Sequence, residues 1–251
     1  MSDPVPPVVP QPQYSAPAYP PQPPQPQFGP PPTNVQPNAQ GMYLGAGSLW
    51  SSQVRPLRGI GGVTRGLILV SAVLALGSII LEGWGIVTLD AYSLGSVGIG
   101  ALQAYDSLSV LVGIVSLVVL VASGICWVVW QYRAAASLPV GVLRRSPGWH
   151  AGSWFIPFAG AWIPFRNISD LARGSRAALG GGTRAAWWAL WIMSGLTGGI
   201  ASRLLTSADT IPSLTGALTI SILSDVLSIA AAIFAWIVVA RITDAIDPAY
   251  R

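Results

Sequence analysis

Residues 144–173 read RRSPGWHAGSWFIPFAGAWIPFRNISDLAR, an aromatic segment with basic residues on both sides. It contains two similar pieces, Trp154-Phe155-Ile156-Pro157-Phe158 and Trp162-Ile163-Pro164-Phe165. Its apolar part is broken by prolines and is too short to cross a bilayer, because a spanning helix needs about 20 apolar residues. Tryptophan rings favour the headgroup level of a membrane, where arginines reach lipid phosphates. We therefore expect residues 144–179 to form an interfacial elbow between membrane spans.

Ten residues of this elbow are expected at the membrane interface: Arg144, Arg145, Trp149, Trp154, Pro157, Trp162, Pro164, Arg166, Arg173 and Arg176. Towards its end, Ile168, Leu171 and Leu179 recur at roughly helical spacing, and the arginines fall between them. This pattern predicts a short amphipathic helix lying on the membrane surface. Three glycines, residues 180–182, are expected to end it and to provide a hinge.

The composition is that of an integral membrane protein. The chain has 251 residues, of which 52% are hydrophobic and 9% charged, with a mean hydropathy of +0.57. A soluble domain carries about 25% charged residues. The net charge of +4 does not indicate nucleic acid, because every basic residue is an arginine and most lie just outside long apolar runs. That distribution is typical of membrane proteins, so we expect a lipid bilayer and no nucleic acid as partner.

Four apolar runs predict an all-α membrane domain over residues 63–247. The expected spans are residues 66–89, 108–130, 185–202 and 214–240. The second is the clearest, since it has no charged residue and would be about 34 Å long as a helix. The end of the first is left open, because Glu82 either terminates the span or lies inside it near the far headgroups.

The first part of the chain is proline-rich. Residues 1–40 hold fifteen of the 22 prolines, with Gln, Ala and Tyr between them. Such a segment buries too little to offset its ordering entropy, so residues 1–62 are predicted to be a disordered Pro/Gln-rich tail and linker. A solvated tail is one interpretation. The other is a docking ligand for cytoplasmic proteins, because residues 20–26 satisfy the PxxP pattern.

The arginines predict the orientation. Twelve of the thirteen lie before span one, between spans two and three, or after span four, and only Arg203 lies on the other side. Loops rich in arginine stay in the cytoplasm. Both termini and the elbow are therefore expected to be cytoplasmic, in a multi-pass protein of the cell membrane whose elbow contacts anionic inner-leaflet lipid.

The elbow also carries a family resemblance. The residues that carry it are Trp130-Gln131-Tyr132-Arg133, Ser146-Pro147-Gly148-Trp149 and the two Trp-Pro pieces. Together they resemble the signature of a bacterial membrane family named domain of unknown function 4328. The resemblance covers residues 62–247. It implies a four-span membrane domain behind a Pro-rich cytoplasmic tail, and it implies no activity, ligand or catalytic residue.

Asp225 is an unusual residue, because it falls near the middle of the fourth predicted span. A carboxylate at the bilayer centre costs about 2.5–3.5 kcal/mol on insertion scales. It is expected to be protonated or to pair with Arg203, Ser202, Thr219 or Ser221 inside the bundle. A structural hydrogen bond between helices is one interpretation, and a proton or ion relay is the other. No second intramembrane acid is evident to accompany Asp225 in a relay.

Gly195 and Gly199 form a GxxxG pattern in the third span, which lets two helix backbones approach closely. Packing within the bundle and formation of a homo-oligomer are both open. His150 and Cys126 stand alone, so no metal set, disulfide or cofactor site is expected. Phosphate-loop, HExxH and GxSxG motifs are missing from the sequence, and we expect no enzyme.

These observations favour a membrane-anchored interaction or scaffold protein, whose elbow engages anionic lipid or a partner and whose tail recruits cytoplasmic proteins. The alternative is a small transporter or channel component that uses Asp225. Convergence of Asp225, Arg203, Thr219 and Ser221 on one cavity would favour transport. Dry packing of Asp225 against a glycine face would favour the scaffold.

Overall fold

The computed structural model describes residues 57–157 and 159–247. These residues belong to the second of two compact units, residues 52–251. The described part is all-α, with six helices. The predicted tail lies outside the described residues up to residue 56, but its last residues are helical. The first helix of the described residues begins at Leu57, and its first turns pack on the last helix, where a side chain at Gly61 would meet Thr243 at 2.9 Å.

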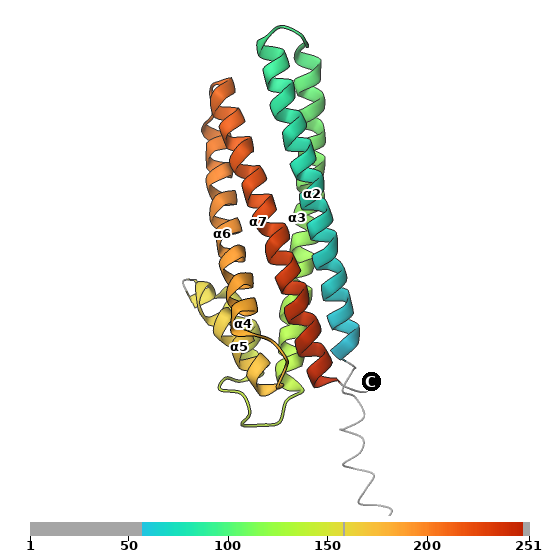
Figure 1. Ribbon diagram of the computed structural model, residues 1–251, viewed down its shortest axis with the longest axis vertical. Helices are drawn as coiled ribbons and strands as arrows, with labels where there is room; N and C mark the ends of the chain where they lie inside the picture. Colours follow the sequence, from blue (N-terminus) through green and yellow to red (C-terminus); the bar gives the residue numbers. More distant parts are fainter. Residues whose placement is uncertain (1–56, 158, 248–251) are drawn as a thin grey trace, which may run out of the picture. The chain divides into compact units, whose positions relative to one another are not determined.

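Along the described chain, two long helices are followed by two short ones and then by two more long helices (Figure 1). The long helices are α2 (Leu57–Ser93), α3 (Ile99–Ala136), α6 (Gly181–Ser207) and α7 (Ile211–Ile246). The short helices are α4 (Pro147–Gly152) and α5 (Ile163–Gly174), with 3-10 turns at Ser153–Phe155 and Ala159–Ala161. Both short helices lie in the elbow, residues 144–179.

Three of the helices, α2, α3 and α7, are long and apolar enough to cross a membrane. The chain is thus a membrane protein with three candidate spans. Helix α2 continues through Glu82 to Ser93, so Glu82 does not end it. The third predicted span lies inside α6, which is not among these three candidate spans.

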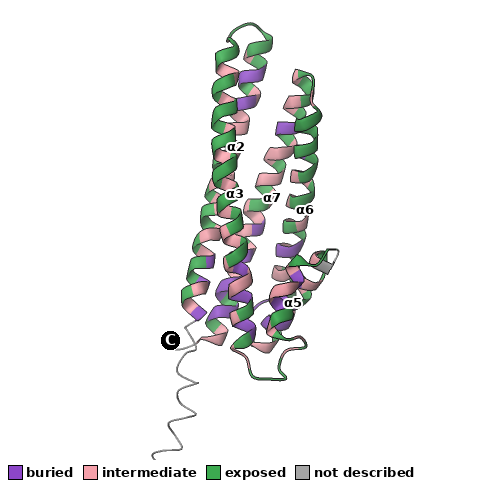
Figure 2. Ribbon diagram, turned by 180° about the vertical axis from the view of Figure 1, so that it is seen from behind, coloured by how far each residue is buried: buried purple, intermediate pink, exposed green. Residues whose placement is uncertain are grey.

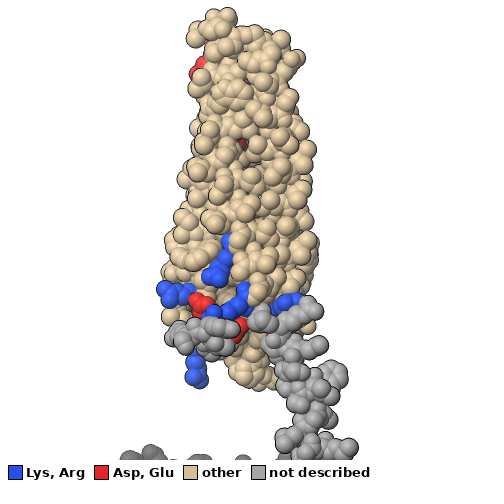
Figure 3. Space-filling model, turned by 90° about the vertical axis from the view of Figure 1, so that its right-hand side faces the viewer, with Lys and Arg blue, Asp and Glu red and all other residues tan. Residues whose placement is uncertain are grey.

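The long helices form two hairpins that meet through α2 and α7. Helix α2 packs on α3 and α7, and α7 packs on α6, which gives the spatial order α3, α2, α7, α6. The first turn of α2 and the last turn of α7 lie together, where Arg58 Nε donates to the carbonyl oxygen of Asp247 at 3.2 Å. Figure 1 shows the elbow at this same end of the helices. We call this end of the helices the arginine-rich end, because most of the arginines visible in Figure 3 lie there.

The buried core is concentrated at the arginine-rich end (Figure 2). Its buried cluster comes from α2, α3, α5, α6 and α7, and the largest fully buried side chains are Trp130, Ile168, Leu171 and Ile242. Towards the other end, which we call the distal end, large apolar side chains are exposed instead. Ile80 is 68% and Val110 is 63% exposed. Such surfaces are stable next to lipid acyl chains and costly in water.

Candidate functional site

Two prolines start the two helices of the elbow. Pro147 is the first residue of α4, and Pro164 lies in the first turn of α5. Proline fits the first turn of a helix, because the N–H that it lacks has no partner there. The two similar Trp-Pro pieces therefore adopt different structures. The first forms a 3-10 turn followed by extended backbone at Ile156, whereas the second opens helix α5.

Asn167 joins the parts of the elbow. Its side chain is fully buried. The amide nitrogen donates to the carbonyl oxygen of Trp149 at 3.1 Å and to Ser153 Oγ at 2.9 Å, and the amide oxygen accepts from Arg145 Nη1 at 3.0 Å. One side chain thus ties α5 to α4, to the following turn and to the preceding loop. Buried polar groups that are fully paired make a segment rigid.

Asp170 lies one turn further along α5 and is also buried. Its carboxylate accepts from the backbone N–H of Arg144 at 2.8 Å and forms an ion pair with Arg173. The imidazole of His150 is also close, with Nε2 at 3.8 Å from Asp170 Oδ2. The carboxylate therefore fastens the loop before α4 to helix α5.

His150 is fully buried in helix α4. Burial lowers the pKa of its imidazole, because the charged form loses its water, and the nearby Arg145 acts in the same direction while Asp170 opposes it. Neither ring nitrogen has a hydrogen-bond partner among residues 57–157 and 159–247. The imidazole is therefore neutral near pH 7.

Beneath these polar contacts lies a tryptophan cluster. It joins α3, α6 and the elbow, and its members are Trp127, Trp130, Trp154, Trp187, Trp188 and Trp191. Neighbouring ring centroids lie 5.0–6.3 Å apart. Two indole groups of the cluster also find polar partners: Trp130 Nε1 donates to Thr243 Oγ1 at 3.0 Å, and Trp154 Nε1 donates to Gln131 Oε1 at 2.8 Å.

The expected interface residues divide into an inner and an outer set. Pro164 is fully buried, and Trp154 is half-buried in the tryptophan cluster. Trp149 is 49% and Trp162 is 56% exposed, and Arg166 lies over the Trp162 ring at 5.1 Å. Phe155, which the sequence did not single out as a site residue, is 77% exposed. The outer set thus presents aromatic rings and arginines together.

The predicted amphipathic helix is present as α5, but it is shorter than predicted, and its apolar side faces the protein core. Ile168 and Leu171 are fully buried in the core, so its apolar side packs on protein rather than on a membrane surface. The helix ends at Gly174, because Arg176 takes a left-handed conformation with φ of 54°. Residues 181 and 182 begin α6 instead of forming a hinge.

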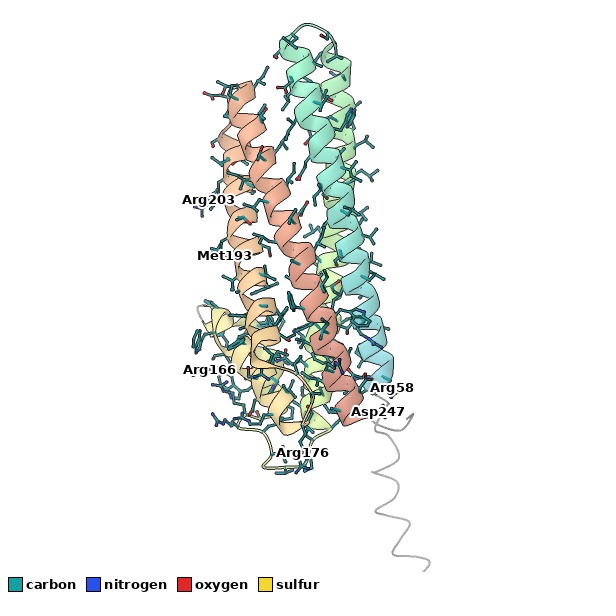
Figure 4. All side chains as sticks on the ribbon, viewed as in Figure 1. Arg58, Arg166, Arg176, Met193, Arg203 and Asp247 are labelled. Atoms are coloured by element: carbon teal, nitrogen blue, oxygen red, sulfur yellow. The ribbon has the colours of Figure 1, made fainter. Side chains whose placement is uncertain are left out.

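The predicted partners of Asp225 do not gather around it. Arg203 is exposed and points outwards from α6 (Figure 4). Thr219 Oγ1 donates to a carbonyl oxygen of its own helix, that of Thr215, at 2.8 Å. Ser221 Oγ donates to the carboxylate of Glu82. Within the described ranges, no hydrogen bond or ion pair joins Asp225 to Arg203, Ser202, Thr219 or Ser221.

Glu82 supplies the second acid that the sequence analysis did not recognise. It lies in the distal third of α2 and contacts α7 through Ser221. Asp225 follows Ser221 by one turn of α7 and therefore lies on the same side of that helix. The sequence could have indicated this second acid, because Glu82 lies within a long apolar run. Its position opposite Asp225 could not be deduced, since it depends on how α2 and α7 pack.

Gly195 and Gly199 are exposed, and a side chain at either would meet nothing within 4 Å. They therefore do not pack against another described helix. Gly198 does this instead, because a Cβ atom there would lie 3.0 Å from Ser224 Oγ. That hydroxyl donates to the carbonyl oxygen of Ser194 at 2.9 Å and links α7 to α6.

No group of three or more His, Cys, Asp or Glu side chains that could hold a metal ion occurs among the described residues. The three long apolar helices define an α-helical multi-pass membrane protein. The sequence model of the family described as "Domain of unknown function (DUF4328)" matches residues 95–244, from the loop after α2 into the last turns of α7. The chain belongs to the DUF4328 family. No significant match was found among curated proteins or among solved structures.

Proposed function

We propose that this protein is a membrane-anchored interaction protein with four spans and a cytoplasmic docking elbow. In this proposal, helix α6 crosses the membrane in addition to the three candidate spans α2, α3 and α7. It has 27 residues, which gives about 40 Å of helix, more than the hydrocarbon core of about 30 Å requires. It also packs along α7, one of the candidate spans. The excess of arginines at the arginine-rich end supports an orientation in which both termini and the elbow lie in the cytoplasm.

The observation that carries this proposal is the contrast within the elbow between a fixed base and an exposed aromatic surface. Asn167 and Asp170 hold its backbone through buried hydrogen bonds, while Trp149, Phe155 and Trp162 remain exposed. A preformed surface loses little conformational entropy when it binds, so it suits docking. We call the three exposed aromatic residues the elbow surface.

Arginines around the elbow surface support anionic inner-leaflet lipid as its partner. They are Arg144, Arg145, Arg166, Arg173 and Arg176. Each basic residue near an anionic leaflet contributes about 1 kcal/mol of attraction, and tryptophan rings settle at the headgroups. The Pro-rich tail, outside the described residues, would recruit cytoplasmic proteins through PxxP motifs.

Photocrosslinking in living cells tests this function. A photoreactive residue replaces Phe155 in the full chain, and the captured molecules are identified by mass spectrometry. Anionic lipid at the elbow, together with proteins whose retention requires residues 1–56, is the expected result. The same residue at Val118, an exposed position on α3, provides the control. An equal set of captured molecules at both positions would contradict the proposal.

A transporter or channel component is the second candidate, and the contact between Glu82 and Ser221 favours it. Two acids and a hydroxyl then lie between α2 and α7 in the part of the bundle expected within the bilayer. Proton or cation flux into vesicles that contain the full chain tests this function. Flux that is lost in both Glu82→Gln and Asp225→Asn supports transport. Absence of flux in the unmodified chain contradicts it.

A further inference from the structure

A groove runs between α2 and α7 next to the arginine-rich end. Its volume is about 340 Å³. All of its lining residues are apolar: Ile68, Leu69, Ala72, Ala232, Ile233, Trp236 and Ile237. Leu69 and Ile233 are more than half exposed, so the groove opens on the outer surface of the two candidate spans.

Arg65 places a fixed positive charge at one end of this groove. Its guanidinium carbon lies 5.3 Å from the ring centroid of Trp236, which itself lines the groove. The cation–π contact uses the face of the guanidinium group and leaves N–H groups at its edge. Those N–H groups suit a phosphate, which arginine binds with two parallel hydrogen bonds.

The helix geometry sets the direction of the groove. Ile68, Leu69 and Ala72 follow Arg65 by three, four and seven residues, so they lie on the same side of α2. At 1.5 Å per residue, Ala72 is about 10 Å further along the helix. The groove thus leads from the charge at the arginine-rich end into the apolar part of the spans.

The surface next to Arg65 has room for a headgroup. Gly62 is exposed, and a side chain there would meet nothing within 4 Å. It precedes Arg65 by three residues and therefore lies beside it on α2. Arg58 is a further turn away on the same side, where it donates to the carbonyl oxygen of Asp247. The surface beside Arg65 is therefore open at Gly62.

We propose that this groove binds one anionic phospholipid of the membrane, with an acyl chain along α2 and α7 and the phosphate on Arg65. Charge complementarity selects this occupant. A lipid with a net negative headgroup is attracted to Arg65 and Arg58, whereas a quaternary ammonium group beside the phosphate would be repelled by them. The site is separate from the elbow surface, and it does not depend on the function proposed above.

The test uses the full chain in bilayer nanodiscs made of phosphatidylcholine. A small amount of phosphatidylglycerol with a photoreactive acyl chain is added, and labelled peptides are mapped by mass spectrometry. Labels are expected on residues 68–72 and 232–237. Arg65→Gln should reduce them about tenfold, the loss expected for one charge-assisted hydrogen bond. Arg203→Gln, which changes an exposed arginine of α6 outside the groove, should leave them unchanged.

A second pair of variants tests the groove without removing a charge. Ala72→Phe fills it and should also reduce labelling about tenfold, whereas Val118→Phe on α3 should not. Tryptophan fluorescence of each variant checks that the bundle is folded. Equal labelling by photoreactive phosphatidylcholine, with no change in Arg65→Gln or Ala72→Phe, would overturn the proposal. Links between two copies of the chain at these residues would also overturn it.

Discussion

The two ends of the helices are built by different rules. At the arginine-rich end, tryptophans are buried together with polar side chains, among them Gln131, His150 and Asn167. At the distal end the helices meet through fewer buried side chains, and large apolar residues such as Ile80 face outwards. The first end therefore derives its stability from specific contacts within the protein. The second depends on the lipid around it, which covers apolar surface without specific partners.

The largest expected effect comes from removing a tryptophan at the arginine-rich end. Trp130→Ala should lower the free energy of unfolding by about 3–5 kcal/mol, because it leaves a cavity and removes the hydrogen bond to Thr243. Trp84→Ala is the matched change at the distal end, where the ring is 39% exposed. Titration of the full chain with SDS measures both. Equal losses would remove the difference between the two ends.

A smaller loss is expected for Asn167→Ala. Its carbonyl, hydroxyl and guanidinium partners would lose their pairing, which should cost about 2–3 kcal/mol. Ser169→Ala, on the same helix, has no hydrogen bond to lose among the described residues and should cost less than about 0.5 kcal/mol. The same unfolding titration compares them. An Asn167→Ala loss no larger than that of Ser169→Ala would show that the elbow is not held by this side chain.

The buried His150 predicts that the stability of the protein depends on pH. Since burial lowers its pKa in the folded state, the unfolded chain binds a proton first as the pH falls. Stability should be constant above the unfolded value of about 6.5 and should decline below it, by at most about 1.4 kcal/mol per pH unit. Unfolding measured between pH 7.5 and 5 checks this. His150→Gln should flatten the profile, and an unchanged slope in that variant would assign the effect to another group.

The smallest effect is expected for Arg203. Its exposed side chain has no ion-pair partner in the part of the chain that the structure describes, so Arg203→Gln should change stability by less than about 0.5 kcal/mol. In a double-mutant cycle with Asp225→Asn, the coupling energy should be close to zero. A coupling above about 1 kcal/mol would mean that the two residues pair across α6 and α7 after all.

Hydropathy was enough to predict an all-α membrane protein, and the tryptophan and proline motifs around the elbow were enough to predict the family. Local signals also predicted helix α5, because Ile168 and Leu171 share one side. The sequence could not show that this side faces protein, since a membrane surface and a tryptophan cluster accept the same apolar pattern. Nor could it pair Glu82 with α7 or reveal Asn167 as a buried link. Those contacts join residues far apart in the chain, and periodicity carries no information about them.

The most direct test of the rigid elbow is hydrogen–deuterium exchange of the full chain in nanodiscs, followed on α4 and α5. The account predicts that amides of α5 exchange as slowly as those of the arginine-rich end of α3, and that Asn167→Ala accelerates exchange in the elbow alone. Exchange of α5 within seconds in the unmodified chain would contradict the account. It would mean that the elbow is a loosely attached surface segment and that its exposed aromatic residues are not held in place.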